Sequence, residues 1–159
     1  MTKSQGAVTP AELVAEFHRV YDLPDNLAAG AEPSLETPRL RMRMSLIEEE
    51  FAELLGSVYG AEARRLVEET INAAPDEGQR DLVETVDALA DLTYVIYGMA
   101  LEIGVDLDQV LAEVHRSNLS KLLPDGSVLR RDDGKVLKGP DFTPPDIRSI
   151  VAPAQVTGE

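Results

Sequence analysis

The chain has 159 residues and a mass of 17.3 kDa, which predicts one domain with a single core. Its 15 basic and 29 acidic residues give a formal net charge of −14, which argues against a general nucleic-acid binder and against docking on an anionic membrane. The lack of cysteine excludes a disulfide scaffold, a thiolate zinc site and a cysteine nucleophile, and two histidines exclude a three-histidine site. Without a membrane-length apolar run or a signal-peptide core, we expect a cytoplasmic protein.

Helical periodicity dominates the chain as far as residue 122. Thr9, Pro10 and Glu12 form a helix start with a capping box, and the apolar spacing after them predicts a helix that ends near residue 23. Prolines and a glycine in 24–38 indicate a loop. The same reasoning predicts four further helices, at about 37–58, 61–73, 79–103 and 106–122.

The character of the sequence changes after residue 122. Three glycines and four prolines between 124 and 145 break regular structure, so an irregular arm is expected. Residues 128–138 fit either a small hairpin around Asp133 and Gly134 or irregular chain, and we expect fraying from about residue 152. The predicted fold is all-α, a four- to five-helix bundle over 1–122 with a C-terminal arm, 123–159, in the same domain.

Three carboxylates share one face of the predicted second helix. Glu49, Glu50 and Glu53 lie in a sector about 100° wide, apart from the apolar stripe of that helix. Like charges one turn apart repel each other, so a partner is expected, either Arg43 or a divalent cation. Oxygen ligands suit Mg²⁺. The alternative is a solvated acidic face on a very acidic protein.

The long helix predicted at 79–103 carries acids within an apolar segment. Glu84, Asp87 and Asp91 fall within an arc of about 60°, opposite an apolar side. A helix that is apolar nearly all round is central to its bundle, and aspartate is rarely buried without a partner. Charge at the helix N-terminus accounts for Glu84 but not for Asp91, so a cation is the favoured partner.

Two helices that present acids to each other form a metal site in the core of a bundle. The di-iron signature Glu-x-x-His is absent, because Ala15 and Ala112 stand three residues before His18 and His115. An oxygen-only site for Mg²⁺, or alternatively Mn²⁺, is therefore preferred.

Basic residues gather in the 18 residues 121–138, which contain five of the 15 in the chain. They are Lys121, Arg130, Arg131, Lys135 and Lys138. Because Mg²⁺ usually binds a few carboxylates together with substrate phosphates, the pattern indicates metal-assisted attack of water on a phosphoanhydride. One glutamate would accept the proton from water. A solvated basic tail is the alternative.

Five segments resemble the all-α NTP pyrophosphatases, the MazG-like proteins related to dimeric dUTPases and phosphoribosyl-ATP pyrophosphohydrolase. They are LIEEEFAE at 46–53, DALADLTYVIYG at 87–98, EVHRSNLSK at 113–121, DGKVLKGP at 133–140 and PPDI at 144–147. The resemblance covers about 12–150 and is greatest to the short, single-domain MazG-like subgroup, some members of which hydrolyse dUTP. It implies Mg²⁺-dependent hydrolysis of a nucleoside triphosphate to monophosphate and pyrophosphate in a homo-oligomer.

The resemblance also implies roles for individual residues. The implied metal ligands are Glu49, Glu50, Glu53 and Asp91, of which Glu49 and Glu50 are also the catalytic carboxylates. The family motif Glu-x-x-Asp lacks its glutamate at Ala88; Asp87 is the favoured replacement and Glu84 the alternative. The implied nucleotide contacts are Asn118, Lys121, Lys135, Lys138 and Tyr94, the lysines at phosphates and Tyr94 either at the base or in the core.

These considerations favour an NTP pyrophosphatase with dUTP as the best single substrate. A nucleotide-binding regulatory module with little turnover is the alternative, to which Ala88 gives weight. A helical interaction protein with solvated acids is a third reading. Because the long apolar helix offers more surface than four short helices can cover, we expect a homodimer, with a tetramer as the alternative.

Overall fold

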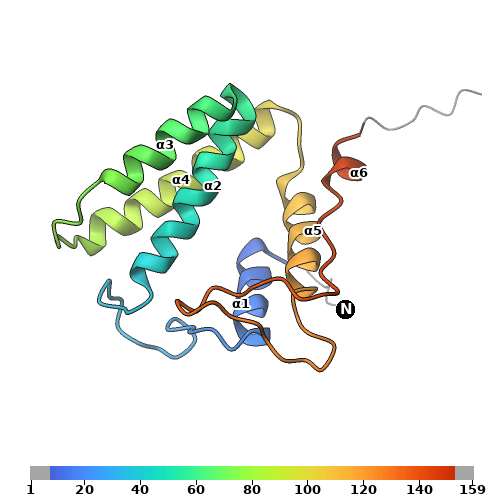
Figure 1. Cartoon of the computed structure of the whole chain (residues 1–159), viewed down its shortest axis with the longest axis horizontal. Helices are drawn as coiled ribbons and strands as arrows, with labels where there is room; N and C mark the ends of the chain where they lie inside the picture. The colour runs from blue at the N-terminus through green and yellow to red at the C-terminus, as the bar shows by residue number, and fades with distance from the viewer. Residues whose placement is uncertain (1–7, 153–159) are drawn as a thin grey trace, which may run out of the picture.

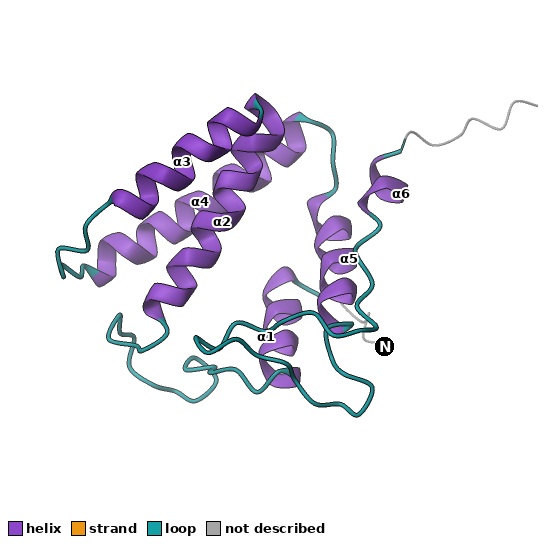
Figure 2. Cartoon of the chain, viewed as in Figure 1, coloured by secondary structure: helices purple, strands orange, loops and turns teal. Residues whose placement is uncertain are grey.

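The computed structural model describes residues 8–152, and within them it consists of helices joined by loops without a β-strand (Figures 1 and 2). The prediction of an all-α fold is confirmed. The helices are α1 (Pro10–Val20), α2 (Leu40–Tyr59), α3 (Ala61–Ala73), α4 (Leu82–Glu102), α5 (Leu107–Leu119) and α6 (Ile147–Val151).

Side-chain caps fix the starts of α1, α4 and α5. At α1 the predicted capping box is confirmed, because the Thr9 hydroxyl accepts from the Glu12 amide and the Glu12 carboxylate accepts from the Thr9 amide. Asp81 caps α4 and Asp106 caps α5 in the same way. The predicted bounds of the first five helices therefore lie within three residues of the observed ones.

The packed helix pairs are α2 with α3, α1 with α5, and α5 with α6. Gly56 allows α2 and α3 to approach closely, because a Cβ there would lie 2.9 Å from the Cβ of Arg64. Tyr21, which follows α1, is fully buried, and its hydroxyl donates to the backbone carbonyls of Asn118 and Leu119 at 2.7 and 3.0 Å. The chain therefore forms two packed groups, one around α2 and α3 and one around α1 and α5 (Figure 1).

The C-terminal arm crosses from α5 back toward α2. Its hairpin is reduced to one isolated antiparallel bridge, between Arg130 and Val136. The short helix α6 was not expected; Asp146 caps it and donates its own amide to Glu113 on α5 at 2.7 Å. The fraying predicted from about residue 152 concerns residues 153–159, which lie outside the described part of the chain.

Helix α4 does not occupy the central place that its apolar sequence predicts. It is absent from the packed helix pairs of residues 8–152, and every residue from Val86 to Ile96 is exposed. No single helix in the described range has the length and apolar character needed to cross a membrane. Helices α4 and α5 have the required length and apolar character only when they are counted as one segment. The chain bends by 112° between them.

The apolar stripe of α2 is also open to solvent. Its members expose between 38% and 53% of their surface, and they are Met44, Ile47, Phe51, Leu54 and Val58. The opposite side of the helix holds Ala52, which is fully buried against the rest of the chain. One chain therefore leaves two apolar helix faces uncovered, on α2 and on α4.

Candidate active site

The acidic turn of α2 lies at the surface, and the helix carries its three glutamates as predicted. Glu49, Glu50 and Glu53 are all exposed, while Ala52 between them is buried. Arg43 does not pair with these acids. It donates instead to Nε2 of His18 at 2.8 Å, while Nδ1 of the same imidazole lies 2.7 Å from the carbonyl of Pro24. Arg43 therefore links α2 to His18 on α1 and leaves the acidic turn to other cations.

The C-terminal arm supplies one of those cations. Nζ of Lys135 donates to Oε2 of Glu49 at 2.6 Å, across 86 positions of sequence. This hydrogen bond lowers the pKa of Glu49, and the positive charges of Lys135, Arg131 and Arg64 lower it further. Glu49 therefore loses its proton more readily than an isolated glutamate, and an acidic helix face meets a basic loop here.

A tight turn in the arm presents Lys135. Oδ1 of Asp133 accepts from the Lys135 amide at 3.0 Å, and the guanidinium of Arg131 pairs with the same carboxylate. Gly134 adopts a positive φ of +87° and has the guanidinium of Arg39 against it, where a Cβ would lie 2.6 Å from Nη1. Glycine is therefore favoured at this turn by its positive φ, which strains any other side chain, whereas the flexible end of Arg39 could move aside for a Cβ.

Two more lysines of the predicted set lie beside Lys135. Burial lowers the pKa of the half-buried Lys121, and the positive charges of Lys138 and Lys135 lower it further, while Glu50 opposes them. Nζ of Lys138 lies 4.6 Å from the ring centroid of Phe142, and Nζ of Lys121 lies 5.9 Å from that of Phe17. The structure thus places Lys135 on Glu49, with Lys121 close enough to feel the charges of Lys135, Lys138 and Glu50, and such a group of cations attracts anionic phosphates.

Glu53 has a partner that the sequence pattern did not identify. Nη2 of Arg64 on α3 lies 3.2 Å from Glu53, and Nε of the same arginine lies 2.7 Å from Glu68. Close packing at Gly56 brings α3 near enough for this pair. Arg64 is the charged residue of this region that the motif-based reasoning missed, because its pairing with Glu53 is set by the packing of α3 on α2 and not by spacing along one helix.

The other predicted site residues lie on α4 and near the end of α5. Asp87, Asp91 and Tyr94 are exposed on α4, Tyr94 with 81% of its surface. Asn118 is partly exposed near the end of α5, and its backbone carbonyl is held by Tyr21. Glu84 lies in the first turn of α4, where its amide donates to the capping Asp81.

The donor set has the right chemistry for Mg²⁺, but one chain does not close a site. Carboxylate oxygens are the ligands that this ion prefers. Among the residues described, no three histidine or carboxylate side chains come close enough together to hold one ion. The acids of α2 and α4 therefore do not form a closed metal site among residues 8–152.

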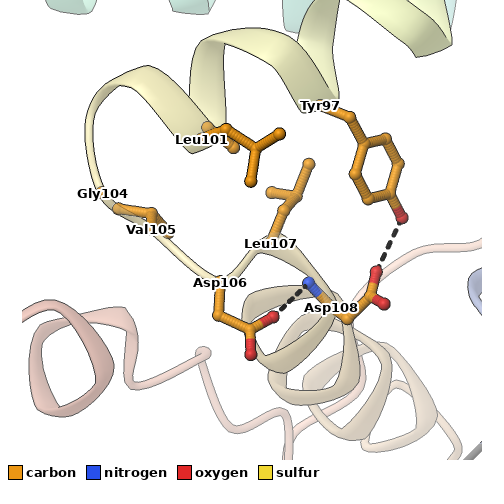
Figure 3. Close-up of a pocket in the computed structure, with 8 residues that line it drawn as sticks. Tyr97, Leu101, Gly104, Val105, Asp106, Leu107 and Asp108 are labelled. Carbon is orange, nitrogen blue, oxygen red and sulfur yellow. Dashed lines mark hydrogen bonds between the residues drawn. The ribbon is translucent and has the colours of Figure 1, made fainter.

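A hollow at the corner between α4 and α5 is mainly apolar (Figure 3). The hydroxyl of Tyr97 donates to Asp108 at 2.8 Å across its mouth, and this bond raises the pKa of Tyr97. Leu101, Val105 and Leu107 line its wall. The hollow is formed by the 112° bend between the helices and contains none of the predicted site residues.

An all-α chain with an acidic helical turn and a basic loop against it is consistent with the helical pyrophosphohydrolases. The family model for phosphoribosyl-ATP pyrophosphohydrolase matches residues 14–118. The chain belongs to this family, and the resemblance found in the sequence is confirmed.

Two further proteins are similar to this chain. The crystal structure of a proposed NTP pyrophosphohydrolase from Exiguobacterium sp. 255-15 has a TM-score of 0.57 and 25% identity, over 88% of this chain and 90% of that one. An uncharacterized protein of Acanthamoeba polyphaga mimivirus is 31% identical over 108 residues, which is 67% of this chain. The chain covers 35% of the length of that viral protein.

Proposed function

We propose that this protein is a Mg²⁺-dependent nucleoside triphosphate pyrophosphatase that cleaves the bond between the α- and β-phosphorus atoms. The observation that carries the proposal is the meeting of Lys135 and Glu49 at 2.6 Å, with Lys121 and Lys138 nearby. Membership of the pyrophosphohydrolase family supports it. We place the catalytic unit in residues 1–122 and treat 123–159 as an arm of the same domain.

The lysines and the carboxylates have different tasks in this proposal. Lys121, Lys135 and Lys138 bind the phosphate oxygens, and Asn118 contacts the nucleoside. The metal ion, Mg²⁺ or alternatively Mn²⁺, is held by five carboxylates, those of Glu49, Glu50, Glu53, Asp87 and Asp91. When bound, the ion neutralises charge on the phosphates. Glu49 or Glu50 orients the attacking water and accepts its proton, for which an ionised carboxylate is required.

The substrate proposed first is dUTP, and Tyr94 is proposed to line the base pocket. The products would be the nucleoside monophosphate and pyrophosphate, which is the chemistry of nucleotide-pool house-cleaning. We propose a homodimer as the working unit, with a tetramer as the alternative. The alternative function is nucleotide binding with little turnover, and Ala88 in place of a motif glutamate favours it.

Pyrophosphate release tests the proposal. The purified chain would be given each common NTP and dNTP, dUTP included, in Mg²⁺ and in EDTA. We expect metal-dependent release from one or a few nucleotides. In ¹⁸O-labelled water the label should enter the monophosphate, because water attacks the α-phosphorus. Label in pyrophosphate, or orthophosphate as the product, would overturn the assigned bond, and binding without release would favour the regulatory alternative.

A further inference from the structure

The two histidines of the chain have no task in the proposed site, and their partners are of opposite kinds. Nε2 of His115 on α5 lies 3.0 Å from the carboxylate of Glu16 on α1. Nε2 of His18 on α1 lies 2.8 Å from the guanidinium of Arg43 on α2. Protonation of the imidazole would strengthen the first contact, because it pairs opposite charges. It would break the second, because it sets two positive charges against each other.

The partners of His18 determine which nitrogen of its ring carries the hydrogen. Nδ1 lies 2.7 Å from the carbonyl oxygen of Pro24, which can only accept, so Nδ1 is the donor. The guanidinium of Arg43 can only donate, so Nε2 is the acceptor and carries no hydrogen. Because arginine keeps its charge at neutral and acidic pH, the contact exists only while the imidazole of His18 is neutral.

The other elements around His18 bring positive charge. These cations are Arg39 and Arg43 on α2, Lys121 after α5, which lies over the ring of Phe17, and Arg130 of the arm, which donates to the carbonyl of Tyr21. The charged groups on α1 and directly after it are Glu12, Glu16, Arg19, Asp22 and Asp25. Among residues 8–152 no carboxylate forms an ion pair with His18. A protonated His18 therefore has no anionic partner in this arrangement.

The contact between His18 and Arg43 joins the two packed groups of the molecule. Within residues 8–152 no helix of the group around α1 and α5 packs closely along a helix of the group around α2 and α3. Side-chain hydrogen bonds connect the groups instead. One is the direct contact of Arg43 with His18, and another is the contact of Lys135 on the arm with Glu49 on α2. The position of α2 therefore depends on a small number of polar contacts.

We infer that neutral His18 is a positioning residue that holds α2 on α1 through Arg43, and that protonation of His18 releases this hold. The proposed site is divided between the same two groups, with its glutamates on α2 and with Asn118 and Lys121 at or just after the end of α5. Only the consequence for turnover rests on the proposed function. Mild acid should lower turnover by displacing α2, although ordinary carboxylates are still mostly ionised there.

A distance between spin labels on α1 and α2 tests the inference without an activity assay. The chain contains no cysteine, so Val14→Cys on α1 and Ser57→Cys on α2, both at exposed positions, give the only two labelling sites. Labelled protein would be mixed with an excess of unlabelled chain, so that distances within one chain are recorded. We expect one narrow distance at about pH 7.5 and a broad distribution at about pH 5, since histidine is the side chain that ordinarily changes charge between them.

Three variants of the labelled chain identify the group that responds to pH. His18→Gln keeps an oxygen acceptor for Arg43 but cannot be protonated, so its distance should stay narrow at both pH values. Arg43→Gln should also stay narrow, because its amide oxygen can accept from a protonated imidazole. His115→Gln is the matched control, the same change at the other histidine, and should broaden as the wild type does. Circular dichroism at each pH checks that each variant is folded.

Each outcome decides the inference separately from the proposed function. A wild-type distance that stays narrow at about pH 5 would overturn the inference, since histidine is ordinarily protonated there. A His18→Gln chain that broadens like the wild type, or a His115→Gln chain that does not, would overturn it as well. In the pyrophosphate assay, the wild type should lose turnover several-fold between the two pH values and His18→Gln much less. A wild type without turnover at either pH would instead contradict the proposed function, while the label distances still decide the role of His18.

Discussion

Helices α4 and α5 follow each other in the chain, yet their surroundings differ sharply. Helix α5 is amphipathic and packs against α1, α6 and the arm, while α4 is apolar on most sides and lies open from Val86 to Ile96. The amphipathic helix needs cover on one side, which its own chain provides. A helix that is apolar on most sides is normally covered on most sides, and residues 8–152 do not provide that cover. The difference divides the described residues into a part that is packed within one chain and a part whose apolar surface stays open within it.

The largest expected effect comes from placing a charge on α4. Leu89→Asp should shift the protein from dimer to monomer, because an unpaired carboxylate in an apolar interface is strongly disfavoured. We expect the dimer dissociation constant to rise about a hundredfold or more, measured by sedimentation velocity across a dilution series.

Leu27→Asp is the matched control, since Leu27 is 92% exposed in the loop before α2 and should leave the assembly unchanged. If Leu89→Asp sediments like the wild type, α4 is not the surface that joins two copies.

A smaller effect is expected where the arm meets α2. Lys135→Met removes the cation from Glu49 and, in the proposed function, one contact to substrate phosphate. We expect KM for the nucleotide to rise about tenfold, the usual scale of one charge-assisted hydrogen bond. The pKa of Glu49 should also rise toward its ordinary value, which NMR of the carboxylates can follow.

Lys135→Arg should retain most of the affinity, because it keeps the charge. If Lys135→Met has the same KM as the wild type, Lys135 does not bind the substrate. That result would say nothing about Lys121 or Lys138.

The self-sufficient part of the molecule is tested at Tyr21. Tyr21→Phe leaves two partly buried carbonyls, those of Asn118 and Leu119, without the hydroxyl that donates to them. We expect a loss of about 1–2 kcal/mol in the free energy of unfolding, which lowers Tm by roughly 3–6 °C for a chain of this size. Tyr59→Phe is the control, because Tyr59 is 75% exposed. Equal melting temperatures for both variants would contradict the structural role of Tyr21.

The smallest effect concerns the pH dependence at Glu113. Hydrogen bonds from Arg116 and from the Asp146 amide lower the pKa of this carboxyl from 4.5 to about 2. Because the folded-state pKa lies below the unfolded one, the stabilisation is present above pH 4.5 and is lost as pH falls toward 2. Glu113→Gln should therefore be less stable than the wild type at neutral pH, by a margin that shrinks through this window in urea unfolding. A margin that does not change with pH would contradict the assigned ionisation.

Sequence reasoning succeeded where local chemistry sets the structure. The capping box of Thr9 and Glu12 and the apolar spacing predicted the bounds of five helices to within three residues. It missed α6, a helix of five residues that depends on a contact between Asp146 and Glu113 across 33 positions. The capped elements are local, whereas α6 needs the rest of the fold.

The candidate site was predicted in part for the same reason. Helical spacing correctly placed Glu49, Glu50 and Glu53 on one exposed face. Spacing alone carried no signal for the pairing of Glu53 with Arg64 or of Glu49 with Lys135, because helix packing and an arm turn create these contacts. The sequence correctly indicated that α4 is apolar on most sides. A sequence pattern does not show which residues pack against such a helix.

Sedimentation equilibrium of the wild-type protein, combined with pyrophosphate assays on the same sample, tests the central claim most directly. The account predicts a mass of twice 17.3 kDa, or a multiple of that dimer, with turnover that falls in proportion as dilution produces monomer. A folded monomer of 17.3 kDa with full turnover would contradict it, because α4 would then need no partner and the site no second copy.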